Sequence, residues 1–179
     1  MSAGTAYIVL FRGVGGKTQL PTALLREALT EVGFANVATY INSGNAVLRS
    51  TIGRDETAKR IAALVKKEFG FTKDIHLATA AEWSRLIELN PFPQAVKVPK
   101  FLHAALLAAA PDRRDIESVE SLAAEGESFA VVGNVAYLHT PDGFGTSKLA
   151  EKFDKGIGVP NTARNWKTVL KLAELAAKA

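Results

Sequence analysis

Three short segments of the sequence combine residue types that can bind an anion. The first, residues 12–18, is a glycine-rich turn that directly follows an apolar run. Glycines let backbone N–H groups converge on an anion, and Arg12 and Lys17 add positive charge on either side. The candidate phosphate contacts in this segment are Arg12, Gly13, Gly15, Gly16 and Lys17. The alternative is a tight turn with incidental basic residues.

The ending Gly16-Lys17-Thr18 invites comparison with the Walker A motif of ATP-hydrolysing proteins. That motif requires a glycine five positions before Gly16, where this chain has Phe11. Pro21 also delays the helix that should begin at the lysine. The spacing therefore argues against a nucleotide-hydrolysing P-loop and leaves a simple anion-binding nest.

The second segment, residues 42–45, has the sequence Asn-Ser-Gly-Asn between two apolar runs. Such residues favour a hairpin turn, because they accept a positive φ and cap their own backbone. Two amides and a hydroxyl can equally hydrogen-bond a base edge, a sugar or a phosphate. A role as a hairpin turn is the simpler interpretation. If the segment binds a ligand, the candidate polar contacts are Asn42, Ser43 and Asn45.

The third segment, residues 161–166, stands at the predicted start of the last helix. With Thr162 as its N-cap, Arg164 and Asn165 would lie in the first helical turn. The helix dipole favours negative charge there, so an arginine is unfavourable unless an acid or an anionic ligand meets it. Arg164 and Asn165 are therefore candidate contacts. Lys148, which follows a Gly-Thr-Ser turn, raises the same question.

Catalytic and metal-binding patterns are harder to find. The chain has no cysteine, which excludes disulfides, thiolate nucleophiles and cysteine zinc sites. His76, His103 and His139 have no metal-ligand spacing, so we predict neither a metal nor another cofactor. His139 and Asp142 could lie close together after a predicted hairpin, but no catalytic group is identified.

The 179 residues carry a net charge of +4 that is concentrated at both ends. Residues 1–26 contribute +3 and residues 146–179 contribute +4, so the stretch between them carries −3. Basic ends that meet in space would create a field that attracts anions, whereas separate ends would only be solvated surface. No apolar run is long enough for a membrane helix or a signal peptide, so we expect a soluble, cytoplasmic protein without a membrane partner.

Hydrophobic periodicity predicts the same order of elements twice. The first half reads strand, helix, hairpin, helix, strand, with strands at 7–11, 37–41, 46–49 and 74–78, and a capping box then starts a further helix at Thr79. The second half reads strand, helix, hairpin and two helices, with strands at 101–108, 128–132 and 135–139 and helices at 111–124, 146–153 and 162–177.

This order predicts an α+β fold of duplicated ferredoxin-like (split βαβ) halves with antiparallel sheets. The first half would span residues 1–90 and the second, with an extra C-terminal helix, residues 101–179. The proline-containing residues 91–100 would link them, unless the two halves form one compact unit.

Taken together, these segments resemble the bacterial domain-of-unknown-function family 1697. The resemblance rests on residues 12–17, Leu20-Pro21, the run Tyr40-Ile41-Asn42-Ser43-Gly44-Asn45, Ser147-Lys148-Leu149, and residues 162–169, which are the most specific match. In the family two further residues usually separate Arg-Gly from Gly-Gly, so this loop is shorter. The resemblance implies a duplicated α+β fold and no particular activity, and it suggests that the three segments form one site.

The leading functional hypothesis is a non-catalytic protein that binds a phosphate-bearing ligand, which could be a nucleotide, a phosphorylated small molecule or nucleic acid. Arg12, Lys17, Lys148 and Arg164 would supply charge. One alternative is an enzyme acting on such a substrate, with His139 or Asp142 as proton carrier. Another is an interaction module in which the shared motifs only form turns and caps.

Overall fold

The protein, described for residues 3–179 in a computed structural model, divides into two compact units. The first unit comprises residues up to Arg85 together with Lys171–Ala179, and the second comprises Leu86–Leu170.

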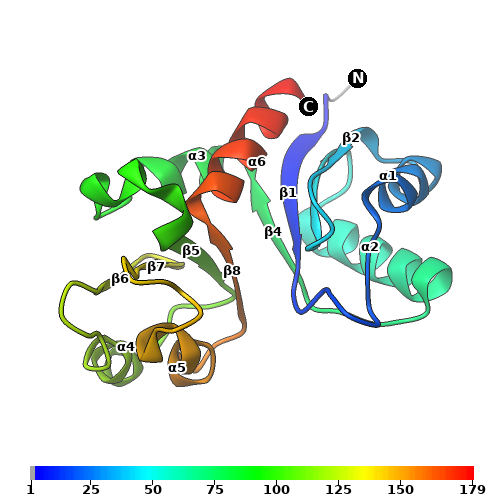
Figure 1. The fold of residues 1–179 in the computed structure, drawn as a ribbon. Coiled ribbons are helices and arrows are strands. Elements are labelled where there is room, and N and C mark those ends of the chain that lie inside the picture. The colour runs from blue at the N-terminus through cyan, green and yellow to red at the C-terminus, as the bar shows by residue number, and fades with distance from the viewer. Residues whose placement is uncertain (1–2) are drawn as a thin grey trace. The chain divides into compact units, whose positions relative to one another are not determined.

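The first unit contains a four-stranded antiparallel sheet in the order β2-β3-β1-β4. Its elements are β1 (Thr5–Phe11), α1 (Thr22–Glu31), β2 (Ala35–Thr39), β3 (Asn45–Ser50), α2 (Arg54–Phe69), β4 (Ile75–Thr79) and α3 (Ala80–Glu88), the last of which continues into the second unit. Helices α1 and α2 cover one face of this sheet (Figure 1).

The central strand β1 is apolar because both of its faces are covered. Val9 points into a core shared with Leu29 of α1 and Ile61 of α2, and all three side chains are fully buried. Ile8, on the opposite face of the strand, is fully buried as well. This explains why the strand reads as a continuous apolar run rather than as an alternating one.

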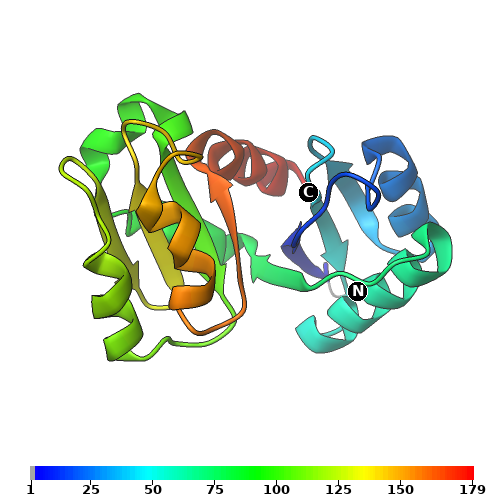
Figure 2. The ribbon, with the colours of Figure 1, turned by 60° about the horizontal axis from the view of Figure 1, so that its bottom comes forward.

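The second unit repeats this architecture with a sheet in the order β6-β7-β5-β8. Its elements are β5 (Leu102–Leu107), α4 (Arg113–Glu120), β6 (Ser128–Val132), β7 (Val135–His139), α5 (Lys148–Gly156), β8 (Asn161–Asn165) and α6 (Trp166–Lys178), whose end belongs to the first unit. Helices α4 and α5 pack on one face of this sheet (Figure 2). The segment before β5 forms two short 3-10 helices, η1 (Pro93–Lys97) and η2 (Pro99–Phe101).

Backbone hydrogen bonds at the end of each central strand confirm the duplication. Phe11 N–H donates to Gly44 O at 2.9 Å, and Arg12 N–H donates to Asp74 O at 3.0 Å. The second unit has the same two bonds, from Leu107 to Asn134 (2.9 Å) and from Ala108 to Pro160 (2.8 Å). The predicted fold, α+β with two antiparallel halves, is therefore confirmed, although the two halves share little sequence.

The prediction for residues 161–165 was wrong, because this segment is a strand and not the start of the last helix. It forms β8, which pairs with β5 over five residues, with Arg164 opposite Ala104. The helix begins only at Trp166, and Asn165, not Thr162, caps it by accepting a hydrogen bond from Thr168 N–H at 3.0 Å. Each unit therefore has the complete order β-α-β-β-α-β-α.

The reason for this error is visible at the equivalent junction of the first unit. Strand β4 also runs directly into helix α3 without a turn between them. Thr79 and Glu82 form the predicted capping box there, with Thr79 N–H donating to Glu82 (2.8 Å) and Glu82 N–H donating to Thr79 (3.1 Å). The last residue of each of these strands is also the N-cap of the following helix. No turn residues therefore separate strand from helix in the sequence, and the boundary between them cannot be seen there.

Among residues 3–179, no helix has both the length and the apolar character needed to cross a membrane.

Candidate functional site

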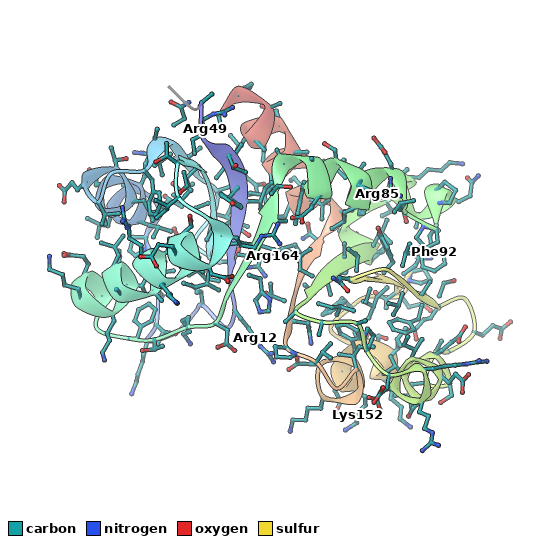
Figure 3. All side chains as sticks on the ribbon, turned by 180° about the vertical axis from the view of Figure 1, so that it is seen from behind. Arg12, Arg49, Arg85, Phe92, Lys152 and Arg164 are labelled. Atoms are coloured by element: carbon teal, nitrogen blue, oxygen red, sulfur yellow. The ribbon has the colours of Figure 1, made fainter. Side chains whose placement is uncertain are left out.

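Three loops of the first unit meet where β1 ends. Besides the bond from Phe11 to Gly44 O, the Lys73 ammonium donates to Gly13 O at 2.7 Å. The β1–α1 loop is thereby joined to the β2–β3 turn on one side and to the loop before β4 on the other. We call the group formed by residues 12–18, residues 41–45 and Lys73 the basic loop end; Figure 3 labels Arg12 within it.

Gly44 allows two of these loops to approach each other. Its φ is +83°, and a Cβ added there would lie 2.8 Å from the Phe11 Cβ and 3.0 Å from a methyl carbon of Val14. Both distances are shorter than ordinary van der Waals contact. The turn can therefore pack on the glycine-rich loop only because residue 44 has no side chain.

The glycine-rich loop is a tight hairpin. Gly15 and Thr18 exchange both backbone hydrogen bonds, at 3.1 and 3.0 Å, which leaves Gly16 and Lys17 at the tip. Gly16 has a φ of +55°, as the first central residue of a type II′ turn requires. The exposed N–H groups of Gly16 and Lys17 have no hydrogen-bond acceptor among residues 3–179. Because α1 begins only at Thr22, the loop does not have the strand–loop–helix geometry of a P-loop.

The turn at residues 41–45 is held together by Asn45. This residue is only 1% exposed, and its amide donates to Tyr40 O at 3.1 Å and to Ser43 Oγ at 3.0 Å. The buried Asn45 side chain therefore fixes the backbone of the turn from its interior side. Asn42 and Ser43 are exposed at its surface.

Positive charge predominates at the basic loop end. Arg12 and Lys73 are half-buried and Lys17 is exposed, while Asp74 is the acidic residue next to Lys73 along the chain. Sequence reasoning missed Lys73 because it lies outside the three motifs. Its position directly before a predicted strand, in the loop that returns beside β1, was the signal that could have indicated it.

The remaining predicted residues lie in the second unit. Lys148 is the exposed first residue of α5, after Ser147, whose hydroxyl caps the helix by accepting from Ala150 N–H at 3.1 Å. Arg164 extends from β8 and donates to Thr162 Oγ1 at 2.7 Å and to Ala163 O at 2.9 Å (Figure 3). Burial lowers the pKa of Arg164 to about 10, so it stays protonated at neutral pH.

Two polar groups of the second unit are buried without a partner. The His103 ring stacks on Phe144 with 3.9 Å between ring centroids, and its Nδ1 has no hydrogen-bond partner among the described residues. The same holds for the Thr140 hydroxyl. Burial lowers the pKa of His103 to about 4, so this histidine is neutral at pH 7.

The proton carriers considered from the sequence are also in the second unit. His139 ends β7 opposite Leu102 and Ser128, and Asp142 lies in the following loop, where its carbonyl accepts from the Thr146 hydroxyl at 3.3 Å. Within residues 3–179, no three His, Asp or Glu side chains are grouped as a metal site would require.

Comparisons with known proteins support the fold. The sequence profile of the family described as "Protein of unknown function (DUF1697)" matches residues 5–137. No curated protein matches the sequence. The solved structure of a conserved bacterial protein from Streptococcus pneumoniae superposes with a TM-score of 0.74 at 21% identity, covering 96% of this chain and 98% of that one.

Proposed function

The chain belongs to the DUF1697 family, whose description names no activity, and we propose from the residues themselves that it binds a phosphate-bearing ligand at the basic loop end. The ligand class includes nucleotides, nucleic acids and phosphorylated small molecules. The contacts are made by the tip of the glycine hairpin, the cations beside it and the polar surface of the adjoining turn.

The observation that carries this proposal is the contact between the glycine hairpin, the Asn-Ser turn and Lys73. Segments separated by up to 60 positions in sequence are joined there by hydrogen bonds of 2.7 to 2.9 Å. Backbone N–H groups without an acceptor, at the tip of a turn with a positive φ, are groups that bind anions in many proteins. The surface therefore offers both hydrogen-bond donors and positive charge to a phosphate.

The degree of burial of the cations fits this role. Lys73 is half-buried and already bound to Gly13 O, so it loses little side-chain entropy on meeting a ligand. Lys17 is exposed at the hairpin tip, so it can reach the anion without moving the backbone. Arg12, directly after β1, adds a third positive charge beside the hairpin.

Isothermal titration calorimetry with pyrophosphate tests the proposal. We expect Lys17→Ala to weaken binding about threefold to tenfold, because it removes one exposed cation from the site without removing a structural contact. The affinity of the unmodified protein should also fall as salt is raised from 50 to 200 mM, since exposed charges are screened over about 10 Å.

Lys59→Ala is the matched control, because Lys59 is an exposed lysine of α2 in the same unit but outside the basic loop end. It should bind pyrophosphate as the unmodified protein does. Equal losses of affinity in both variants would mean that only the net charge of the protein matters, which would contradict a site at the basic loop end. The absence of binding to pyrophosphate and to any nucleotide would overturn the proposal.

A further inference from the structure

Ile41, the first residue of the 41–45 turn in the basic loop end, has an unfavourable backbone conformation. Its φ is +46°, in the left-handed region, and 48% of the residue is exposed to solvent. A β-branched residue is an outlier there, because its side chain crowds the backbone. Asn36 of β2, with a φ of +51°, is the other non-glycine residue of this kind among residues 3–179, and asparagine tolerates the conformation.

The surrounding bonds impose this conformation on Ile41. Tyr40 N–H donates to Asn45 O at 3.1 Å, the Asn45 amide donates back to Tyr40 O, and Gly44 fixes the turn against Phe11. The result is an aliphatic side chain held at the surface instead of in the core. Such strain tends to persist at sites that hold ligands.

We propose that Ile41 contacts the base of a nucleotide whose phosphates lie on the glycine hairpin and its cations. This inference rests on the proposed function and specifies its ligand class. Ile41 precedes Asn42, whose exposed side-chain amide has hydrogen-bond donors and an acceptor. An apolar side chain next to an exposed amide suits a flat ring with a polar edge.

Other phosphate compounds fit this combination less well. Inorganic phosphate and pyrophosphate have no apolar part for Ile41 to contact. A sugar phosphate would place hydroxyl groups against the aliphatic side chain, which would remove water from those groups without a replacement partner. A nucleotide uses the apolar side chain, the polar turn and the cations together.

The experiment compares three probes by calorimetry: pyrophosphate, ribose 5-phosphate and a nucleoside diphosphate. We expect the nucleoside diphosphate to bind at least tenfold more tightly than pyrophosphate. In Ile41→Asn this advantage should shrink to about threefold or less, while the affinity for pyrophosphate stays within twofold. The same variant should melt at an equal or higher temperature, because asparagine relieves the backbone strain.

Asn36→Gly is the control, since it also relaxes a left-handed position and lies outside the basic loop end. It should leave all three affinities unchanged. The inference is overturned if pyrophosphate binds as tightly as the nucleotide, or if Ile41→Asn keeps the full nucleotide advantage. A complete absence of pyrophosphate and nucleotide binding instead contradicts the proposed function itself. Repeating the titration with a short single-stranded oligonucleotide shows whether the base belongs to a free nucleotide or to a nucleic acid.

Discussion

Gly44 determines whether the glycine hairpin and the Asn-Ser turn can touch. The Gly44→Ala substitution would place a methyl group 2.8 Å from the Phe11 Cβ and force a non-glycine residue to a φ of +83°. We expect a loss of about 1–3 kcal/mol in the free energy of unfolding, together with weaker pyrophosphate binding, because the two loops must separate. Urea denaturation and calorimetry measure the two effects.

Gly145→Ala is the matched comparison for this prediction. Gly145 has no left-handed φ, and apart from its own residue and its chain neighbours no atom lies within 4 Å of an added Cβ. Its substitution should change stability by less than about 0.5 kcal/mol. An unchanged stability and affinity in Gly44→Ala would show that the two loops are not held together as described.

His103 should make the stability of the protein depend on pH. Its pKa is lowered by burial from 6.5 to about 4, so the unfolded chain binds the proton more readily than the folded chain. The free energy of unfolding should therefore decrease as pH falls from about 6.5 to about 4, by up to about 3 kcal/mol from this group. The His103→Phe substitution keeps an aromatic ring stacked on Phe144 but removes the group that binds the proton.

Chemical denaturation at several pH values between 4 and 7 tests this prediction. The decrease in stability should be shallower for His103→Phe than for the unmodified protein. Parallel curves for the two proteins would mean that His103 does not titrate in this range.

At the residue scale, the sequence predicted the glycine hairpin and the Asn-Ser turn because turn residues have strong local preferences. It did not predict Lys73, whose role depends on the return of a distant loop beside β1. It also could not separate the exposed Asn42 and Ser43 from the buried Asn45. That distinction depends on the hydrogen bond from Asn45 to Tyr40 O.

At the scale of elements, the junction of β8 and α6 shows where pattern reasoning fails. Residues 161–165 contain no apolar run, because β8 is an edge strand whose buried residues include the polar Asn161 and Thr162. The strand is defined by its pairing with β5, which is not a local property. The β6–β7 hairpin, whose strands are rich in apolar residues, was predicted with the bounds that the structure shows.

Asn165 should stabilise the start of α6 as its N-cap. Asn165→Ala removes the acceptor for Thr168 N–H and should cost about 1 kcal/mol of unfolding free energy, whereas Asn165→Asp should retain most of the stability. Thermal and urea denaturation of both variants check this. Equal losses in the two variants would assign Asn165 a role other than helix capping.

At the scale of the whole molecule, the duplication concerns the fold and not the basic loop end. The backbone hydrogen bonds at the ends of β1 and β5 identify equivalent positions in the two units. Arg12 corresponds to Ala108, and its acceptor Asp74 corresponds to Pro160. Gly44 corresponds to Asn134. The second unit therefore has the neutral Ala108 and Pro160 where the first has the charged Arg12 and Asp74. The topology could be predicted because the order of elements repeats in the sequence. The difference in charge between the loops of the two units could not, because the register of the strands decides which loop residues are equivalent.

This difference predicts a single anion site per chain. Calorimetric titration with pyrophosphate should give a stoichiometry close to one, because only the first unit has the glycine hairpin and its cations. A stoichiometry of two would mean that basic residues of the second unit, such as Lys148, bind an anion independently.

The most direct test of the central claim is a titration with pyrophosphate followed by the backbone amide signals of ¹⁵N-labelled protein. We predict that the largest shifts occur at Gly16 and Lys17, with smaller ones at residues 42–45 and at Lys73, and that the amide of Lys59 does not move. Shifts confined to other parts of the chain, or no shifts at saturating pyrophosphate, would contradict the proposal that the basic loop end binds phosphate.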